Sequence, residues 1–156
     1  MIRQFLSLIL RDNLILSLQK TKQMNNKLLI GGLIGGVASF LVGYLIFVLA
    51  LDTTLNAHTM PGISREHPEF FHIFLGNLAF GFLLAYILTK SNTSGFSNGA
   101  KMGFIIGLLT ILGHNLISFG TTKVIADITG LLIDVIAVAV LFAIVGGIVG
   151  WWLGRK

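Results

Sequence analysis

Long apolar stretches, separated by short polar ones, make up most of the chain after its first two dozen residues. An apolar run of about 20 residues is long enough to cross a bilayer core of roughly 30 Å. In lipid an isolated segment must satisfy its own backbone hydrogen bonds, which favours helices. The pattern therefore predicts an all-α polytopic membrane protein, a four-transmembrane-helix bundle. The expected helices lie at about 28–51, 70–88, 102–119 and 128–153, with Asp127 or Thr122 as the cap of the last helix.

Composition supports this class. Of the 156 residues, 54% are hydrophobic and 11% are charged, whereas a soluble domain carries about 25% charged residues. There are 0 cysteines, which excludes disulfides, thiolate metal sites and cysteine nucleophiles.

Residues 1–23 differ from the four-helix transmembrane domain that we assign to residues 24–156. Ile2 and Phe5 fall on one helical face, and Arg3 falls on the other. This pattern predicts a short amphipathic helix at the cytoplasmic membrane surface. In the alternative interpretation, "MNNKLL" is an ordinary start and the preceding segment is an extension without a role.

Basic residues orient the predicted bundle. Nine of the 11 Lys and Arg side chains lie before the first helix, between helices two and three, or in the C-terminal tail. The other two, Arg65 and Lys123, lie on the opposite side. Because cytoplasmic loops are enriched in Lys and Arg, we expect both termini in the cytoplasm of a cell-membrane protein. This bias also accounts for the net charge of +5, so we expect contact with the lipid bilayer and none with nucleic acid.

Glycines four residues apart mark the cytoplasmic half of three helices. Small residues at this spacing share a helix face and let two backbones approach closely. We expect these glycines to pack helices within the bundle; the alternative is that one row forms a dimer interface. The packing glycines are Gly31, Gly35, Gly99, Gly103, Gly107, Gly146, Gly150 and Gly154.

Asp134 is the one charged residue in the apolar run "GLLIDVIAVAVLFAIV". An aspartate at a helix centre costs about 2.5–3.5 kcal/mol on insertion scales, so it should face the bundle interior. Other polar residues have a similar expected depth, which predicts an outward-facing polar cleft: His72, Asn77, His114 and Asn115. Two interpretations stay open for Asp134, namely hydrogen bonding between helices and a role as ligand contact or proton carrier.

His72 and His114 lie on successive antiparallel helices. Two such histidines can bind a haem between helices or a divalent metal ion, although hydrogen bonding to backbone or water is the simpler alternative. We otherwise expect no cofactor. The sequence contains no nucleophile-elbow pattern, so we assign no catalytic residue and do not expect an enzyme.

The chain from about residue 24 onward resembles the small four-helix bacterial membrane proteins grouped as domains of unknown function. "FLVGYLIF" in the first helix, the glycine-punctuated third helix and the C-terminal "GGIVGWWLGR" carry the resemblance. It implies a four-helix membrane protein, and it implies no activity and no site residue.

The leading hypothesis is a non-enzymatic small membrane subunit or ligand-binding protein, acting as a homo-oligomer or with a membrane partner protein. One alternative is a small oligomeric transporter or proton-coupled permease that uses Asp134 and His114. The other is a membrane redox protein that holds haem or metal through His72 and His114.

Overall fold

The structure is a computed structural model that describes residues 26–63, 65 and 67–155. It is all-α, and four of its helices are long and apolar enough to cross a membrane, which confirms the predicted class. The proposed amphipathic segment 1–23 lies outside the described residues. The spanning helices are Asn26–Ala50, which ends in the π-helix η1 (Tyr44–Ala50), α3 (Phe70–Lys90), α4 (Phe96–Thr121) and α5 (Ile128–Leu153); the short α2 (Asp52–Ala57) follows the first.

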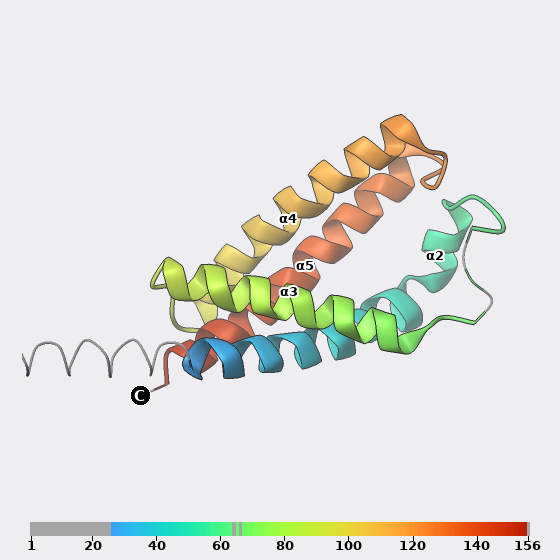
Figure 1. Ribbon diagram of the computed structural model, residues 1–156. Coiled ribbons are helices and arrows are strands. Elements are labelled where there is room, and N and C mark those ends of the chain that lie inside the picture. Colours follow the sequence, from blue (N-terminus) through green and yellow to red (C-terminus); the bar gives the residue numbers. More distant parts are fainter. Residues whose placement is uncertain (1–25, 64, 66, 156) are drawn as a thin grey trace, which may run out of the picture.

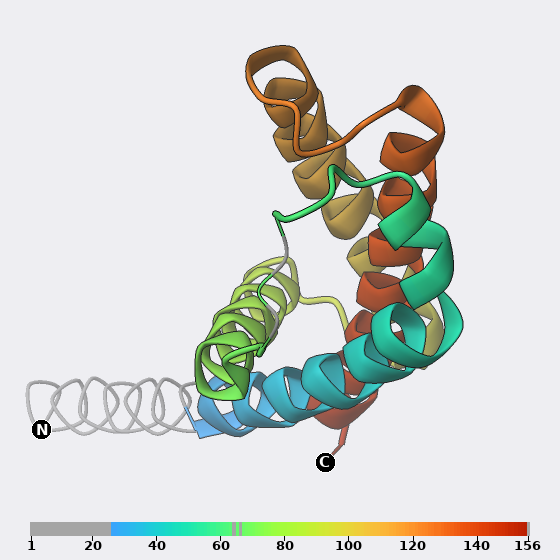
Figure 2. The ribbon, with the colours of Figure 1, turned by 90° about the vertical axis from the view of Figure 1, so that its right-hand side faces the viewer.

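The four spanning helices form two hairpins arranged as a V (Figure 1 and Figure 2). The first helix pairs with α3, and α4 pairs with α5. The hairpins meet at the end that holds the α3–α4 turn and the C-terminus, where Lys27 Nζ donates to the Arg155 backbone oxygen at 2.6 Å. They diverge toward the other end, where α2 lies. We call these the closed end and the α2 end.

Glycines hold the closed end together. A Cβ atom on Gly146 would lie 2.5 Å from the Gly99 oxygen, and one on Gly150 would lie 2.8 Å from the Gly99 Cα. Such distances leave no room for a side chain between α4 and α5. Gly35 of the first helix is equally restricted, because its Cβ would lie 2.8 Å from Val149 of α5. The glycine rows therefore pack against helices of the same chain.

The buried core joins the two hairpins near the closed end. It is formed by side chains of α3 and α5: Leu84, Ala85, Leu88, Leu141, Phe142, Val145 and Val149. Beyond this core, toward the α2 end, large apolar side chains such as Phe70 (56% exposed) and Phe71 (69% exposed) lie at the surface. A surface of this kind suits contact with lipid chains.

The first, second and fourth predicted helices agree with the structure to within two residues at each end, but α4 begins at Phe96 instead of 102. Gly95 adopts φ 87° and ends the turn. The polar residues that follow are helical because Gly99 packs against α5. The polar stretch from 96 to 101 is therefore a helix end and not a loop.

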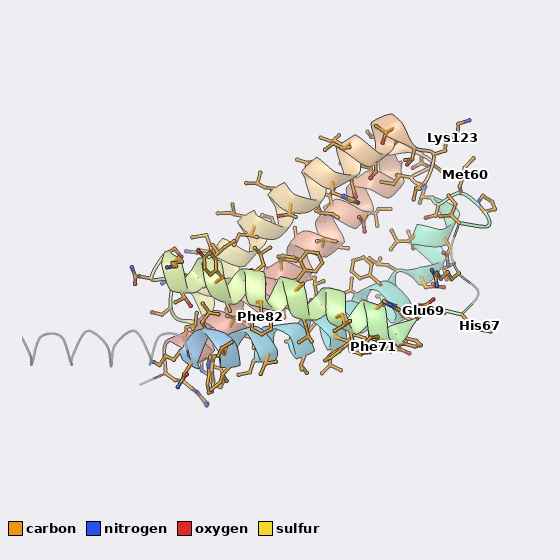
Figure 3. All side chains as sticks on the ribbon, in the orientation of Figure 1. Met60, His67, Glu69, Phe71, Phe82 and Lys123 are labelled. Carbon is orange, nitrogen blue, oxygen red and sulfur yellow. The ribbon has the colours of Figure 1, made fainter. Side chains whose placement is uncertain are left out.

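A segment after the first helix connects the two hairpins at the open end of the V. The loop after α2 runs antiparallel to the α4–α5 loop, with a bridge between Thr59 and Ile125. The Ala126 amide donates to the His58 oxygen at 2.9 Å. Met60 and Lys123 mark these two loops at the α2 end (Figure 3). The hairpins are thus joined twice, by the core at one end and by this loop contact at the other.

Candidate functional site

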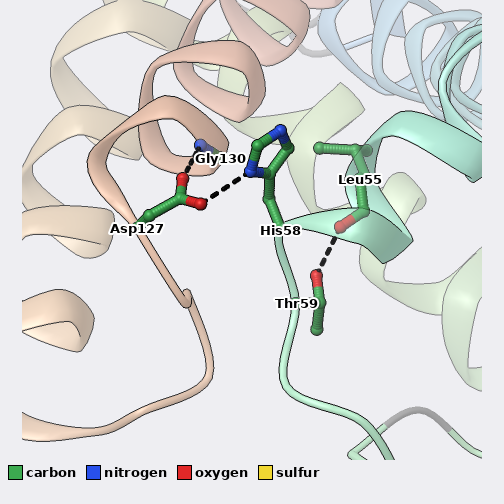
Figure 4. Close-up of polar contacts among 5 residues, drawn as sticks. All are labelled: Leu55, His58, Thr59, Asp127 and Gly130. Carbon is green, nitrogen blue, oxygen red and sulfur yellow. Dashed lines mark hydrogen bonds and ion pairs between the residues drawn. The ribbon is translucent and has the colours of Figure 1, made fainter.

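Asp127 fixes the loop contact to the start of α5. It is the N-cap of α5, and its Oδ1 accepts a hydrogen bond from the Gly130 amide at 2.8 Å. Its Oδ2 lies 2.7 Å from His58 Nδ1 (Figure 4). The Gly130 amide and, after it, His58 lower the pKa of Asp127. One carboxylate oxygen of Asp127 therefore caps α5, and the other holds the segment after α2 on α5 through His58.

Asp134 lies about two turns further along α5 and has a different partner. Its Oδ2 accepts a hydrogen bond from Asn115 Nδ2 of α4 at 2.6 Å. Asn115 is 3% exposed, and Asp134 is half-buried. The pair lines a pocket of about 240 Å³ at the α2 end. We call it the polar pocket, and its polar side chains are His58, Thr59, His114, Asn115, Ser118 and Asp134.

The structure brings three of the five predicted site residues together and places two elsewhere. Asp134, His114 and Asn115 line the polar pocket. Asn77 of α3 instead accepts a hydrogen bond from Ser39 at 2.6 Å. His72 lies 2.6 Å from a Glu69 carboxylate oxygen at the exposed start of α3.

Sequence reasoning did not assign Ser39 or His58 to a site. Ser39 is 2% exposed and pairs with Asn77 across the first hairpin. The sequence signal for Ser39 is the presence of a serine within an otherwise apolar helix. His58 reaches the polar pocket because the loop after α2 folds back over α5, and no spacing in the sequence indicates that fold.

A second cavity lies between the hairpins, next to the polar pocket. Its volume is about 350 Å³, and all four spanning helices contribute to its lining. The walls are mainly aromatic and aliphatic, for example Phe47, Phe80, Ile111 and Leu141. Asn77 and Thr110 are among its few polar residues. We call this cavity the apolar chamber.

The two histidines proposed as metal or haem ligands line different pockets. His72 lies with Arg65, Pro68 and Glu69, and His114 lies in the polar pocket. Among the residues that the structure describes, no group of three or more His, Asp or Glu side chains is placed to hold a metal ion.

No protein-family model, no curated protein and no solved structure matches the chain. Of the resemblance to four-helix bacterial membrane proteins, the structure therefore supports the general class alone, which is a small protein with four candidate membrane spans.

Proposed function

We propose that this chain is a non-enzymatic integral membrane protein that binds a small ligand in the polar pocket. The observation that carries the proposal is the placement of Asp134. It lies about two turns inside a spanning helix, is half-buried and lines a pocket of about 240 Å³. Acidic residues inside membrane segments are costly, and they mark ligand and ion sites unusually often.

Several separate segments of this one chain contribute to the polar pocket. Its residues come from α2, α4, α5 and the two loops at the α2 end. The glycine rows, which also suggested a dimer, pack inside the same chain. Ligand binding is for this reason better supported than a role as a subunit that gains its site from a partner.

The pocket in this proposal opens on the side of the membrane opposite the cytoplasm. The nine-to-two distribution of Lys and Arg supports this orientation. Lys27 and Arg155, which belong to the basic side, meet at the closed end. The α2 end then faces the periplasm or the cell exterior.

Native mass spectrometry of protein released from membranes tests the proposal. Asp134→Asn removes the charge and keeps a polar side chain of the same size beside Asn115. The matched control is Asp52→Asn, because Asp52 is an exposed acid at the start of α2 outside the polar pocket. We expect a bound small-molecule mass on the wild type and on Asp52→Asn that Asp134→Asn loses. Equal bound masses on all three proteins would refute the proposal.

A further inference from the structure

The geometry points to a ligand class. We propose that the polar pocket and the apolar chamber form one elongated site for a single-chain lipid whose head group carries an amine. The inference rests on the proposed function, because the polar pocket is the same site and here receives the head group.

The two cavities follow one another along the same face of the α4–α5 hairpin. On α4, Thr110 of the chamber precedes His114 of the polar pocket by four residues. On α5, Val138 of the chamber follows Asp134 of the polar pocket by four residues. Residues four apart lie one above the other on a helix. A ligand that enters from the α2 end therefore meets polar groups first and apolar walls about one turn deeper.

Asp134 selects the chemistry of the head group. Its carboxylate has one hydrogen-bond donor, Asn115, whereas two carboxylate oxygens offer about four acceptor positions. Within the described part of the chain, the ion pairs involve other acids, so Asp134 has no cationic partner there. His58, which lines the same pocket, is already engaged by Asp127. Ionisable groups inside membrane segments usually pair with one another, and an amine head group offers Asp134 a partner of opposite charge.

The chamber selects a hydrocarbon chain. Its walls are almost entirely apolar, and the few polar groups include Asn77, whose oxygen is occupied by Ser39. Small-molecule sites usually enclose about 300–1,000 Å³. At about 350 Å³, the chamber is at the lower end of that range, which fits one chain better than the two chains of a phospholipid.

A π-helix shapes one wall of the chamber. Three lining residues, Tyr44, Phe47 and Val48, belong to η1, where Leu51 N donates to Ile46 O at 2.9 Å. Single-turn π-helical segments occur frequently at functional sites. Gly43, which precedes η1, also lines the chamber, and a Cβ there would meet its nearest neighbours at 3.9 and 4.0 Å. A larger residue at Gly43 would thus fill the chamber without striking the backbone.

The experiment uses two spin-labelled probes in phosphatidylcholine nanodiscs that contain the full chain. One probe is octadecylamine and the other is octadecanoic acid, each with a nitroxide near the chain end. Electron paramagnetic resonance reports the immobilised fraction of each probe. We expect the wild type to bind the amine about tenfold more tightly than the acid, which corresponds to about 1.4 kcal/mol.

Two pairs of variants separate the head-group and chain contributions. Asp134→Asn should abolish the preference for the amine, and Asp134→Glu should keep it. Gly43→Val should weaken binding of both probes. Gly113→Val is the matched control, because a Cβ on Gly113, also in a spanning helix, would meet nothing within 4 Å; it should bind both probes like the wild type.

Equal binding of amine and acid by the wild type, or an unchanged preference in Asp134→Asn, would overturn the inference. Unchanged binding in Gly43→Val would also overturn it, since the chain would then lie elsewhere. If mass spectrometry still shows an Asp134-dependent ligand in any of these cases, only the lipid assignment fails. If no Asp134-dependent mass is found, the proposed function fails as well.

Discussion

Asp127, the N-cap of α5, and Asp134, about two turns into α5, have different surroundings. Asp127 uses both oxygens within the protein, one with the Gly130 amide and one with His58. Asp134 has Asn115 as its hydrogen-bond partner and lines a cavity. Asp127 therefore serves to hold the α2 segment in place, and Asp134 retains acceptor capacity for a ligand.

The lowered pKa of Asp127 predicts how stability changes with acid. The variant Asp127→Asn provides the comparison, because an asparagine can still cap α5 but does not titrate. Because the pKa of Asp127 in the folded protein lies below the usual 3.8, its stabilising effect is fully present above that value. The effect is lost as the pH falls through the folded pKa. We expect the melting temperature of the wild type to exceed that of Asp127→Asn at neutral pH.

Thermal unfolding in detergent at neutral pH and at about pH 3 or below provides the measurement. The difference between the two proteins should shrink in acid. A difference that is unchanged at low pH would show that the carboxylate charge does not hold the α2 segment.

The helices themselves could be predicted well from the apolar pattern, whereas the glycine spacing predicted close packing within the bundle without indicating which two helices meet. The pattern could not locate the start of α4, because Ser97, Asn98 and Lys101 are polar although helical. It also could not indicate η1, whose residues are as apolar as the α-helix before them. A π-helix depends on which backbone carbonyl each amide meets, and hydropathy carries no information on that choice.

The α4–α5 contact gives a prediction at this scale. Gly146→Val would place a side chain against the Gly99 oxygen, whereas Gly113→Val projects into open space. Overpacking of a close contact costs about 1–3 kcal/mol. We expect Gly146→Val to lower the unfolding free energy by at least this amount relative to Gly113→Val. Unfolding by denaturing detergent measures both, and equal stabilities would contradict the tight packing.

At the scale of the whole molecule, the V arrangement decides which polar residues meet. Counting residues along each helix placed five polar residues at a similar depth in the membrane, which predicted one shared cleft. In the structure these five residues lie in three different places. Asn77 lies on the α3 side of the opening, so it meets Ser39 and the chamber instead of Asp134. His72 lies at the exposed start of α3. Depth can be estimated by counting residues, but the direction in which each helix faces follows from packing between hairpins.

The proposed orientation can be tested because the chain has 0 cysteines. Met60→Cys places a thiol at the α2 end, and Ser94→Cys places one in the α3–α4 turn at the closed end. In intact cells, a membrane-impermeant maleimide should label Met60→Cys and leave Ser94→Cys unlabelled until the cells are opened. The reverse pattern would place the polar pocket on the cytoplasmic side.

The central claim is that the space between the hairpins holds a defined ligand and not bulk lipid. Photocrosslinking followed by mass spectrometry tests it most directly, with a benzophenone-bearing phenylalanine in place of Phe47 or, separately, Leu49. Phe47 lines the apolar chamber, and Leu49, also in η1, is 64% exposed. We predict one dominant adduct mass at Phe47 and the mixture of membrane phospholipids at Leu49. The same phospholipid mixture at both positions would contradict the claim.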